Sequence, residues 1–135
     1  MLISTKGRYA LRVLIEIASH NEGEYVRLDE IAKSQGISEK YLESIVSILV
    51  KGKLLKGLRG RGGGYRLTKH PADYSIGEIL RLTEGSLAPV ACLESGSKKC
   101  DRADSCKTLP LWKSLDNRIN EFLDSVTLYD LLMEQ

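Results

Sequence analysis

The chain has 135 residues, enough for one compact core with a short extension and too few for a second independent domain. Hydrophobic residues make up 42% and charged residues 28%, which is ordinary for a globular protein and excludes extensive disorder. No apolar run approaches the roughly 20 residues of a membrane helix, and the first residues, MLISTKGRYALR, lack the apolar core of a signal peptide. We therefore expect a cytoplasmic protein with no membrane partner.

The net charge of +2 conceals a division between the two halves of the chain. Residues 1–70 contain 13 Lys and Arg against 7 Asp and Glu, whereas residues 71–135 contain 7 against 11. A basic front half followed by an acidic back half indicates a polyanionic partner for the front half alone. The alternative is a chance segregation of charges on solvated faces.

The first predicted elements are helices. Between residues 4 and 20, apolar pairs recur every four residues, which predicts an amphipathic helix capped by Ser4 or Thr5. An extended stretch at residues 25–27 leads to a helix over residues 28–35 that ends at Gly36. Ser38 then caps a longer helix whose inner side carries Leu42, Ile45, Leu49 and Val50. Two helices joined by a tight turn are the outline of a helix-turn-helix, although an ordinary helical hairpin has the same outline.

The next segment predicts a β-hairpin with a glycine-rich tip. The chain is extended from Lys53 to Leu58, passes through RGRGGG at residues 59–64, and returns through residues 65–67. Residues 44–72 contain seven Lys and Arg and no Asp or Glu, a density of one sign that indicates an anionic partner. A nucleotide-binding loop is disfavoured, because the Lys-Ser/Thr ending of a P-loop is missing and no helix follows directly. A simple flexible hairpin remains as an alternative, but it leaves the tip arginines unexplained.

The last third of the chain predicts two helices separated by a long polar loop. The first helix spans residues 75–84, with Ser75 and Glu78 spaced as a capping box. Residues 86–108 are too long for a plain connector, which makes them a functional candidate. A final helix from about Pro110 to Val126 has one apolar stripe, made of Trp112, Leu115, Ile119, Phe122 or Leu123, and Val126. This stripe predicts dimerisation through the helix, and an ordinary core helix is the alternative.

All three cysteines lie in this loop, at Cys92, Cys100 and Cys106. In a reducing cytoplasm such a cluster is more typical of a metal or redox site than of a disulfide framework. The odd number also leaves one thiol without a disulfide partner.

Several short motifs along the chain form a recognisable set. They are ISTKGRYAL at residues 3–11, Ile31-Ala32, Tyr41-Leu42-Glu43 after Ser38, and Arg59-Gly60 followed by Gly62-Gly63-Gly64-Tyr65. The set continues with LTEGSLAPV at residues 82–90 and TLYDL at residues 127–131. Together these motifs resemble the Rrf2 family of transcription regulators over nearly the whole chain.

The resemblance implies a mainly helical winged helix-turn-helix with a small β-hairpin wing and a long C-terminal dimerisation helix. It implies a homodimer on a double-stranded DNA operator, with one helix in the major groove and the wing in the minor groove. We expect a DNA-binding domain at residues 1–85, a cysteine-containing sensor loop at 86–108, and a dimerisation helix and tail at 109–135. The expected DNA-binding residues are Ser38, Glu39, Lys40, Tyr41 and Glu43 on the recognition helix, and Arg59, Arg61, Gly62, Gly63 and Tyr65 on the wing.

Glu43 has two interpretations. A carboxylate repels phosphate but accepts a hydrogen bond from the amino group of cytosine, so Glu43 is a candidate for reading a base. It could equally be a solvent-exposed glutamate that stabilises its helix.

In the cluster-bearing members of the family, three cysteines before the last helix hold an iron-sulfur cluster. The resemblance therefore implies a 2Fe-2S cluster on Cys92, Cys100 and Cys106. Two positions depart from the family: Leu109 stands where the iron-sulfur assembly regulators usually have a histidine, and Arg8 stands where the nitric-oxide sensors have a carboxylate. The fourth ligand is left open among Glu94, Asp101, Asp104 and a small thiol from solution.

The sequence thus predicts a sequence-specific DNA-binding repressor that senses iron-sulfur or redox status through its cysteines. The alternative is a cluster-free regulator of cysteine or sulfur metabolism, which works by a thiol switch or by binding a partner enzyme of cysteine or iron-sulfur metabolism. Zinc is a further possible occupant. An electron-transfer protein would leave the basic hairpin unexplained. We do not expect an enzyme, because His20 and His70 lie apart from the cysteines in the sequence and no Ser-His-Asp set is evident.

Overall fold

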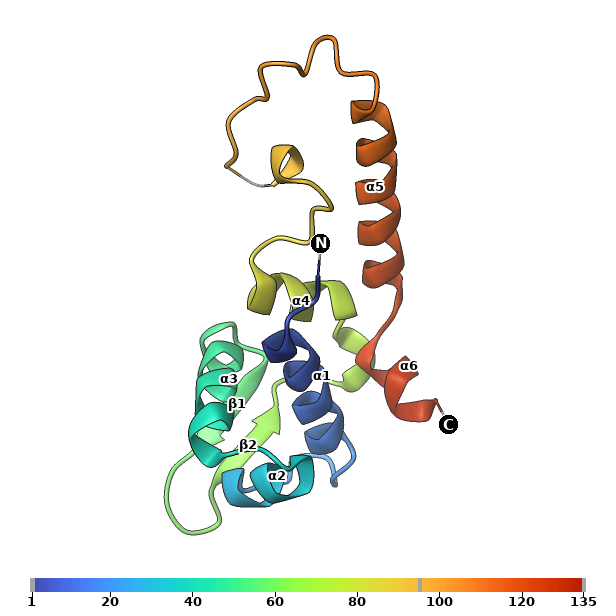
Figure 1. Ribbon diagram of the computed structural model, residues 1–135. Helices are drawn as coiled ribbons and strands as arrows, with labels where there is room; N and C mark the ends of the chain where they lie inside the picture. Colours follow the sequence, from blue (N-terminus) through green and yellow to red (C-terminus); the bar gives the residue numbers. More distant parts are fainter. Residues whose placement is uncertain (1, 95, 135) are drawn as a thin grey trace.

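Figure 1 shows the computed structural model of the chain, which describes residues 2–94 and 96–134. In chain order the elements are α1 (Thr5–Ala18), α2 (Leu28–Gln35), α3 (Glu39–Lys51), β1 (Leu55–Leu58), β2 (Gly64–Leu67), the 3-10 turn η1 (Pro71–Asp73), α4 (Ile76–Glu84), the 3-10 turn η2 (Ala91–Leu93), α5 (Leu109–Ser125) and α6 (Leu128–Met133). The prediction of a mainly helical fold with a small β-hairpin is confirmed. No helix within these two stretches is long and apolar enough to cross a membrane.

Side-chain caps fix where the first helices begin. The hydroxyl of Ser4 accepts a hydrogen bond from the Gly7 N–H at 3.1 Å and starts α1. The hydroxyl of Ser38 accepts one from the Tyr41 N–H at 3.1 Å and starts α3. Between them, α2 ends at Gly36, whose φ of 67° lies in the left-handed region that glycine adopts most easily. This turn packs α2 against α3 and forms the predicted helix-turn-helix.

Strands β1 and β2 pair antiparallel, with Leu55 opposite Leu67 and Leu58 opposite Gly64. A bridge joins the hairpin to the segment before α2: the N–H groups of Val26 and Tyr65 each donate to the other's carbonyl oxygen at 2.8 Å. Position 64 requires glycine, because its φ is +144° and an added Cβ would collide with the Val26 carbonyl. The hairpin is therefore anchored to the helical body along one edge.

The core lies between α1, α3, α4 and the base of the hairpin. Its largest fully buried side chain belongs to Tyr74. The Tyr74 hydroxyl donates to the Leu54 carbonyl at 2.7 Å and accepts from the Thr68 N–H at 2.9 Å. Leu54 precedes β1 and Thr68 follows β2, so one buried phenol ties both ends of the hairpin to the start of α4.

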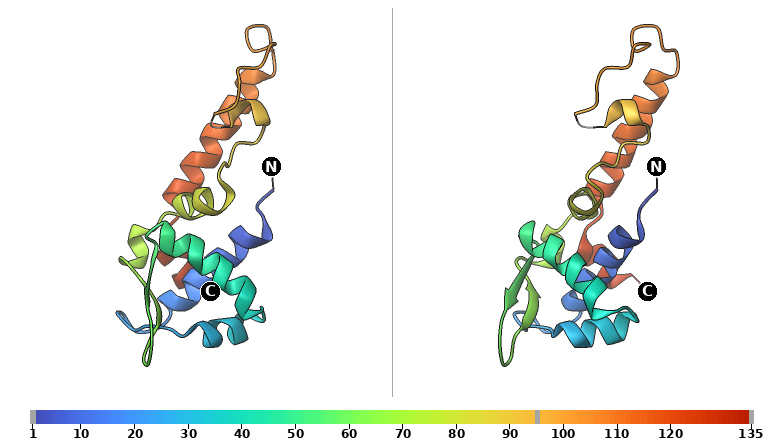
Figure 2. Two further views of the ribbon diagram at one scale, coloured as in Figure 1. Left: turned by 90° about the vertical axis from the view of Figure 1, so that its left-hand side faces the viewer. Right: turned by 60° about the vertical axis from the view of Figure 1, so that its left-hand side comes forward.

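The C-terminal part of the chain leaves this body and then returns to it. Helix α5 projects outward, and the described residues 86–94 and 96–108 connect the end of α4 to the distant end of α5 (Figures 1 and 2). After α5, the Ile76 N–H donates to the Val126 carbonyl at 2.9 Å and the Leu128 N–H donates to the Tyr74 carbonyl at 3.0 Å. The Leu128 side chain is fully buried, so the chain's end belongs to the N-terminal core.

Two details of the helices differ from the sequence analysis. No helix is predicted in the tail from the sequence, but Thr127 and Asp130 form a capping box that starts α6. The capping box predicted at Ser75 is only half present. The Ser75 hydroxyl accepts from the Glu78 N–H at 3.1 Å, whereas the Glu78 carboxylate binds Lys69 Nζ at 2.8 Å.

Candidate DNA-binding surface and cysteine loop

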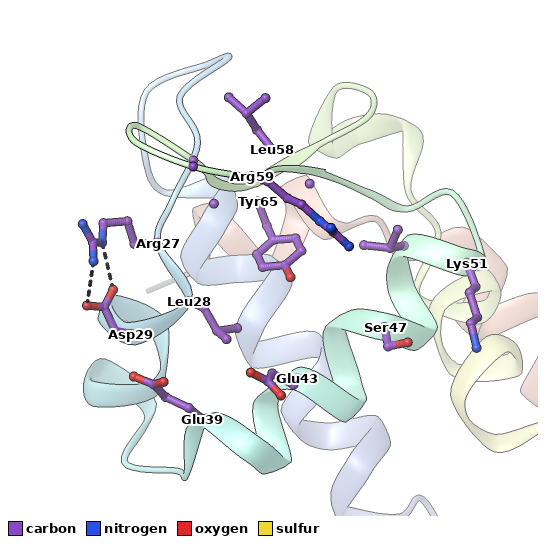
Figure 3. Close-up of a pocket in the computed structure, with 15 residues that line it drawn as sticks. Arg27, Leu28, Asp29, Glu39, Glu43, Ser47, Lys51, Leu58, Arg59 and Tyr65 are labelled. Atoms are coloured by element: carbon purple, nitrogen blue, oxygen red, sulfur yellow. Dashed lines mark hydrogen bonds and ion pairs between the residues drawn. The ribbon is translucent and has the colours of Figure 1, made fainter.

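A cleft of about 780 Å³ separates α3 from the hairpin (Figure 3). The α3 side is formed by Glu39, Glu43, Ser47, Val50 and Lys51, which recur at helical spacing. The hairpin side is formed by residues 57–60 and 63–65. One exposed helix face therefore lies beside the exposed hairpin, the arrangement that a winged helix uses to contact two neighbouring grooves of DNA.

The five residues predicted on the recognition helix have different surroundings. Glu39 and Glu43 are exposed and line the cleft. Lys40 is exposed but lies outside the cleft lining. The Ser38 hydroxyl is engaged as the helix cap, and the Tyr41 ring packs edge-on against Tyr9, with ring centroids 6.0 Å apart. Cap and ring contact fix the start of the helix and leave its cleft-facing carboxylates free.

The five residues predicted on the wing are divided in a similar way. Arg59, Gly63 and Tyr65 line the cleft, while Arg61 and Gly62 are exposed at the tip outside it. Gly63 is buried, and an added Cβ there would meet the backbone of residues 58 and 60. The glycines thus permit a narrow tip, and the two arginine side chains are left as its charged groups.

The cleft also contains residues that the sequence analysis did not single out. Arg27 pairs with Asp29 through two hydrogen bonds of 3.1 and 3.2 Å at one side of the cleft (Figure 3). The hydrogen bond from Arg27 holds the pKa of Asp29 below its ordinary value, and Asp29 in turn raises the pKa of Arg27. Val50 was predicted on the inner side of its helix, which is wrong, because it is 37% exposed and lines the cleft.

The three cysteines lie on the loop before α5 and are free thiols. Cys92 and Cys100 are exposed, and Cys106 is half-buried. Within residues 2–94 and 96–134, no three His, Cys, Asp or Glu side chains are close enough together to hold a metal ion. The structure therefore does not bring the three predicted ligands together.

Cys106 has the most defined surroundings of the three. Its sulfur lies 3.3 Å from the Thr108 hydroxyl, just before α5 begins. That hydrogen bond, followed by the backbone N–H of Thr108, lowers the pKa of the Cys106 thiol from its ordinary value. A lowered pKa favours the thiolate, the form that binds metals and attacks disulfides.

The candidate oxygen ligands Glu94, Asp101 and Asp104 are all exposed. Asp104 accepts a hydrogen bond from Lys99 Nζ at 3.0 Å. None of the three is gathered with the cysteines, so the fourth position stays open.

Helix α5 carries an exposed apolar surface. Leu111 is 57% exposed and Phe122 is 65% exposed, and Leu115 is also exposed. Ile119 and Leu123 on the same helix are half-buried and pack against the core. Of the predicted stripe, Ile119 and Leu123 therefore hold α5 on its own body, whereas Leu115 and Phe122 are exposed together with Leu111, which was not part of the prediction.

A helix-turn-helix with its second helix beside a basic, glycine-tipped hairpin defines a winged-helix DNA-binding protein. Comparison with known proteins agrees. The model of the Rrf2 family, described as an iron-dependent transcriptional regulator, matches residues 3–134. The chain therefore belongs to the Rrf2 family and is a DNA-binding transcriptional regulator, as predicted.

Three relatives illustrate this membership. The chain is 37% identical over 134 residues to the HTH-type transcriptional regulator IscR of Vibrio cholerae, an alignment that covers 99% of this chain and 76% of that protein. It resembles the structure of CymR, the global cysteine regulator of B. subtilis, with a TM-score of 0.79 and 39% identity over 98% of this chain and 96% of that one. It also resembles T. potens IscR, with a TM-score of 0.75 and 36% identity over 98% of this chain and 86% of that one.

Proposed function

We propose that this regulator is a cytoplasmic repressor that binds its operator as a homodimer, through α3 and the hairpin wing, without a catalytic step. The observation that carries the proposal is the cleft in which the cap-anchored α3 and the arginine-bearing wing face each other. Ser38, Glu39, Lys40, Tyr41 and Glu43 are assigned to the major groove. Arg59, Arg61, Gly62, Gly63 and Tyr65 are assigned to the wing contact.

The positive and negative side chains of the cleft have different roles in DNA binding. Arg59 and Arg61 at the wing tip supply attraction to phosphates and to the negative potential of a narrow minor groove. The Glu43 carboxylate is repelled by phosphate and can only gain by accepting from a base, such as the amino group of cytosine. Affinity therefore comes mainly from the wing, and base discrimination comes from α3.

The proposal of dimerisation through α5 is supported by its uncovered apolar surface. Leu111, Leu115 and Phe122 are exposed on a helix that already uses Ile119 and Leu123 to hold its own body. A second copy packed on this surface would remove these side chains from water and place two recognition helices on two half-sites. Sedimentation at micromolar protein checks this, since a monomer would contradict it.

For sensing, we propose that Cys92, Cys100 and Cys106 hold a 2Fe-2S cluster. The set of donors fits, because thiolates are the ligands that such clusters take and the pKa of Cys106 is already lowered. When bound, the cluster would supply sensitivity to iron supply and to oxidation. Leu87 is the one buried residue among the described residues 86–94 and 96–108, so little packing opposes a rearrangement of the loop.

A thiol switch is the second candidate function. It is favoured by the separation of the three thiols, by Leu109 in place of a histidine ligand, and by the similarity to a protein described as a global cysteine regulator. In this version an oxidised cysteine, or a partner enzyme docked on the loop, replaces the cluster.

The DNA-binding proposal is tested by replacing Arg59 and Arg61 together with alanine. Fluorescence anisotropy with duplexes selected from a random pool by the wild-type protein should show about tenfold or greater loss of affinity. The slope of log affinity against log salt should become shallower by about 0.9 for each phosphate that the variant no longer neutralises. The double variant Lys98→Ala/Lys99→Ala removes the same charge from the cysteine loop and should bind as the wild type does. Equal salt slopes for both variants would remove the wing from the binding surface.

The cluster proposal is tested by anaerobic reconstitution of the full chain with iron and sulfide. A coloured protein with two irons per chain is expected, and the colour should be lost when Cys92, Cys100 or Cys106 is replaced singly by serine. Circular dichroism should show that each variant keeps its fold. A colourless wild-type protein whose DNA affinity still responds to oxidant through these cysteines would establish the thiol switch instead.

A further inference from the structure

A second pocket, of about 560 Å³, lies on the other side of the hairpin from the DNA-binding cleft. It is lined by the end of α1 and the loop that follows, by Lys56 of β1, by Arg66 and Leu67 of β2, by the η1 turn and by α6. Its volume falls in the range of small-molecule sites. Nothing in the proposed binding of DNA or in the cysteine loop uses it.

Two cationic side chains of the pocket, Arg66 and Lys56, are placed so that they can bind an anion. Arg66 lies over the Tyr25 ring at 4.8 Å and donates to the Gly23 carbonyl at 3.4 Å, which fixes the guanidinium and leaves other N–H groups to donate. Lys56 stands opposite Arg66 in the β1–β2 register. Lys56 makes no hydrogen bond or ion pair with any residue that the structure describes. A carboxylate can bind an arginine fork in two places at once, which makes it the natural partner for this pair.

A histidine adds a neutral donor to the same pocket. His70 Nδ1 accepts the Ala72 N–H at 3.1 Å, so the proton of its neutral ring is assigned to Nε2. The His70 ring lies 5.9 Å from that of Tyr129, the first of two α6 residues in the lining. The other is Leu132, and these side chains give the pocket an apolar and aromatic wall beside its charges.

The other charged residues of the lining affect which ligand charge the pocket favours. Lys69 is already paired with Glu78 at 2.8 Å. Glu22 and Glu24 lie in the loop after α1, where they oppose an anion at that edge. The Arg66 guanidinium reaches this loop through its hydrogen bond to Gly23, so the cationic end of the pocket is formed by Lys56 and the Arg66 N–H groups that this bond leaves free, with the two glutamates as a mixed rim beside it.

We propose that this pocket binds a small organic carboxylate with an aromatic or aliphatic body. The carboxylate lies against Lys56 and Arg66, with His70 as a further donor, and the apolar body lies against Tyr129 and Leu132. An occupant would contact β1 and β2, the two strands whose connecting tip carries Arg59 and Arg61. It would do so on the side of the hairpin that faces away from the DNA-binding cleft. The site is independent of the proposed operator contacts and is testable without DNA.

The test is an NMR titration of the full, ¹⁵N-labelled chain with 3-phenylpropionate. Saturable shifts confined to the amides around Lys56, Arg66 and His70 are expected. The uncharged 3-phenylpropanamide, which has the same body, should bind about tenfold more weakly, because it cannot form the charge-assisted hydrogen bonds. Phenylalanine, which adds an ammonium group, decides whether the pocket takes simple acids or amino acids, and saturation by either supports the site.

Matched variants keep the proposal falsifiable. Lys56→Gln should weaken binding of 3-phenylpropionate by about fivefold, the contribution of one typical hydrogen bond at an exposed site. Lys51→Gln removes the same charge from the DNA-binding cleft and should leave ligand affinity unchanged. Both side chains are exposed, so neither change endangers the fold. No saturation at millimolar ligand, or equal weakening by both variants, would overturn the proposal.

Discussion

The DNA-binding half and the cysteine loop are built in opposite ways. The helix-turn-helix and hairpin surround a core of fully buried side chains, and the bridge between Val26 and Tyr65 fixes the wing to it. In the loop, one described residue, Leu87, is buried, and the thiols are not gathered. A surface that reads DNA needs its side chains fixed before the partner arrives, because ordering them afterwards would cost affinity. A sensor needs a segment that can take two arrangements, and weak packing permits this.

Substitution of glycines with positive φ should give the largest difference in stability between these two regions. At Gly64, alanine would combine a strained φ of +144° with a collision against the Val26 backbone, so Gly64→Ala should destabilise the fold by about 3 kcal/mol. At Gly96, φ is +78° but no atom lies within 4 Å of the added Cβ, and Gly96→Ala should cost about 1 kcal/mol or less. Urea denaturation of both variants measures the difference. Equal losses would show that the loop is as tightly constrained as the wing.

A smaller effect is expected where α5 is tied to the body. Arg81 donates to Asp124 at 2.7 and 3.1 Å and to the Asn120 side chain at 2.7 Å. The Arg81 and Asp124 side chains are 38% and 49% exposed, so Arg81→Gln should lower the free energy of unfolding by no more than about 1 kcal/mol. The hydrogen bond from Arg81 holds the pKa of Asp124 below its ordinary value.

The sign of the pH dependence follows from that lowered pKa. The stabilisation is fully present above the pKa of an unfolded aspartate and is lost as pH falls through the lower pKa of folded Asp124. The stability difference between wild type and Arg81→Gln should thus be largest near neutral pH and shrink in acid. Lys99→Gln, which breaks the exposed pair with Asp104 in the cysteine loop, is the matched control and should show no measurable difference at either pH. A difference that grows in acid would contradict the assignment.

Local signals in the sequence were sufficient for much of the fold. Serine before an amphipathic run predicted the starts of α1 and α3, and RGRGGG predicted the hairpin tip, because caps and glycine turns depend on neighbours in the chain. The same reasoning missed α6, a helix of six residues whose place depends on burial of Leu128 beside Tyr74. It also misplaced Val50, because a helix that faces both a core and a cleft has apolar residues on each side.

Prediction of the candidate sites from the sequence was limited in the same way, because residues that meet only in the tertiary fold were missed. Motif resemblance selected Arg59, Glu43 and the cysteines, but not the Arg27–Asp29 pair, which reaches the cleft only through the tertiary fold. Spacing in the sequence also could not show that the three thiols lie apart, since Leu87 is the one buried side chain among the described residues 86–94 and 96–108 that could fix their arrangement.

The smallest effect expected concerns the one thiol of the loop with a defined environment. In a Cys92→Ser/Cys100→Ser background, adding Thr108→Val removes the hydroxyl that contributes most to the lowered pKa of Cys106. That pKa should rise, less thiolate should be present at pH 7, and alkylation by iodoacetamide should slow by about two- to fivefold. Thr108→Ser keeps the hydroxyl and should react as the parent does. Above pH 10 the rates of all three proteins should converge, because a thiol with an ordinary pKa of about 8.5 is then ionised in each. A rate difference that persists at high pH would mean that access to the sulfur, rather than its ionisation, had changed, and Cys106 would then be as loosely held as the rest of the loop.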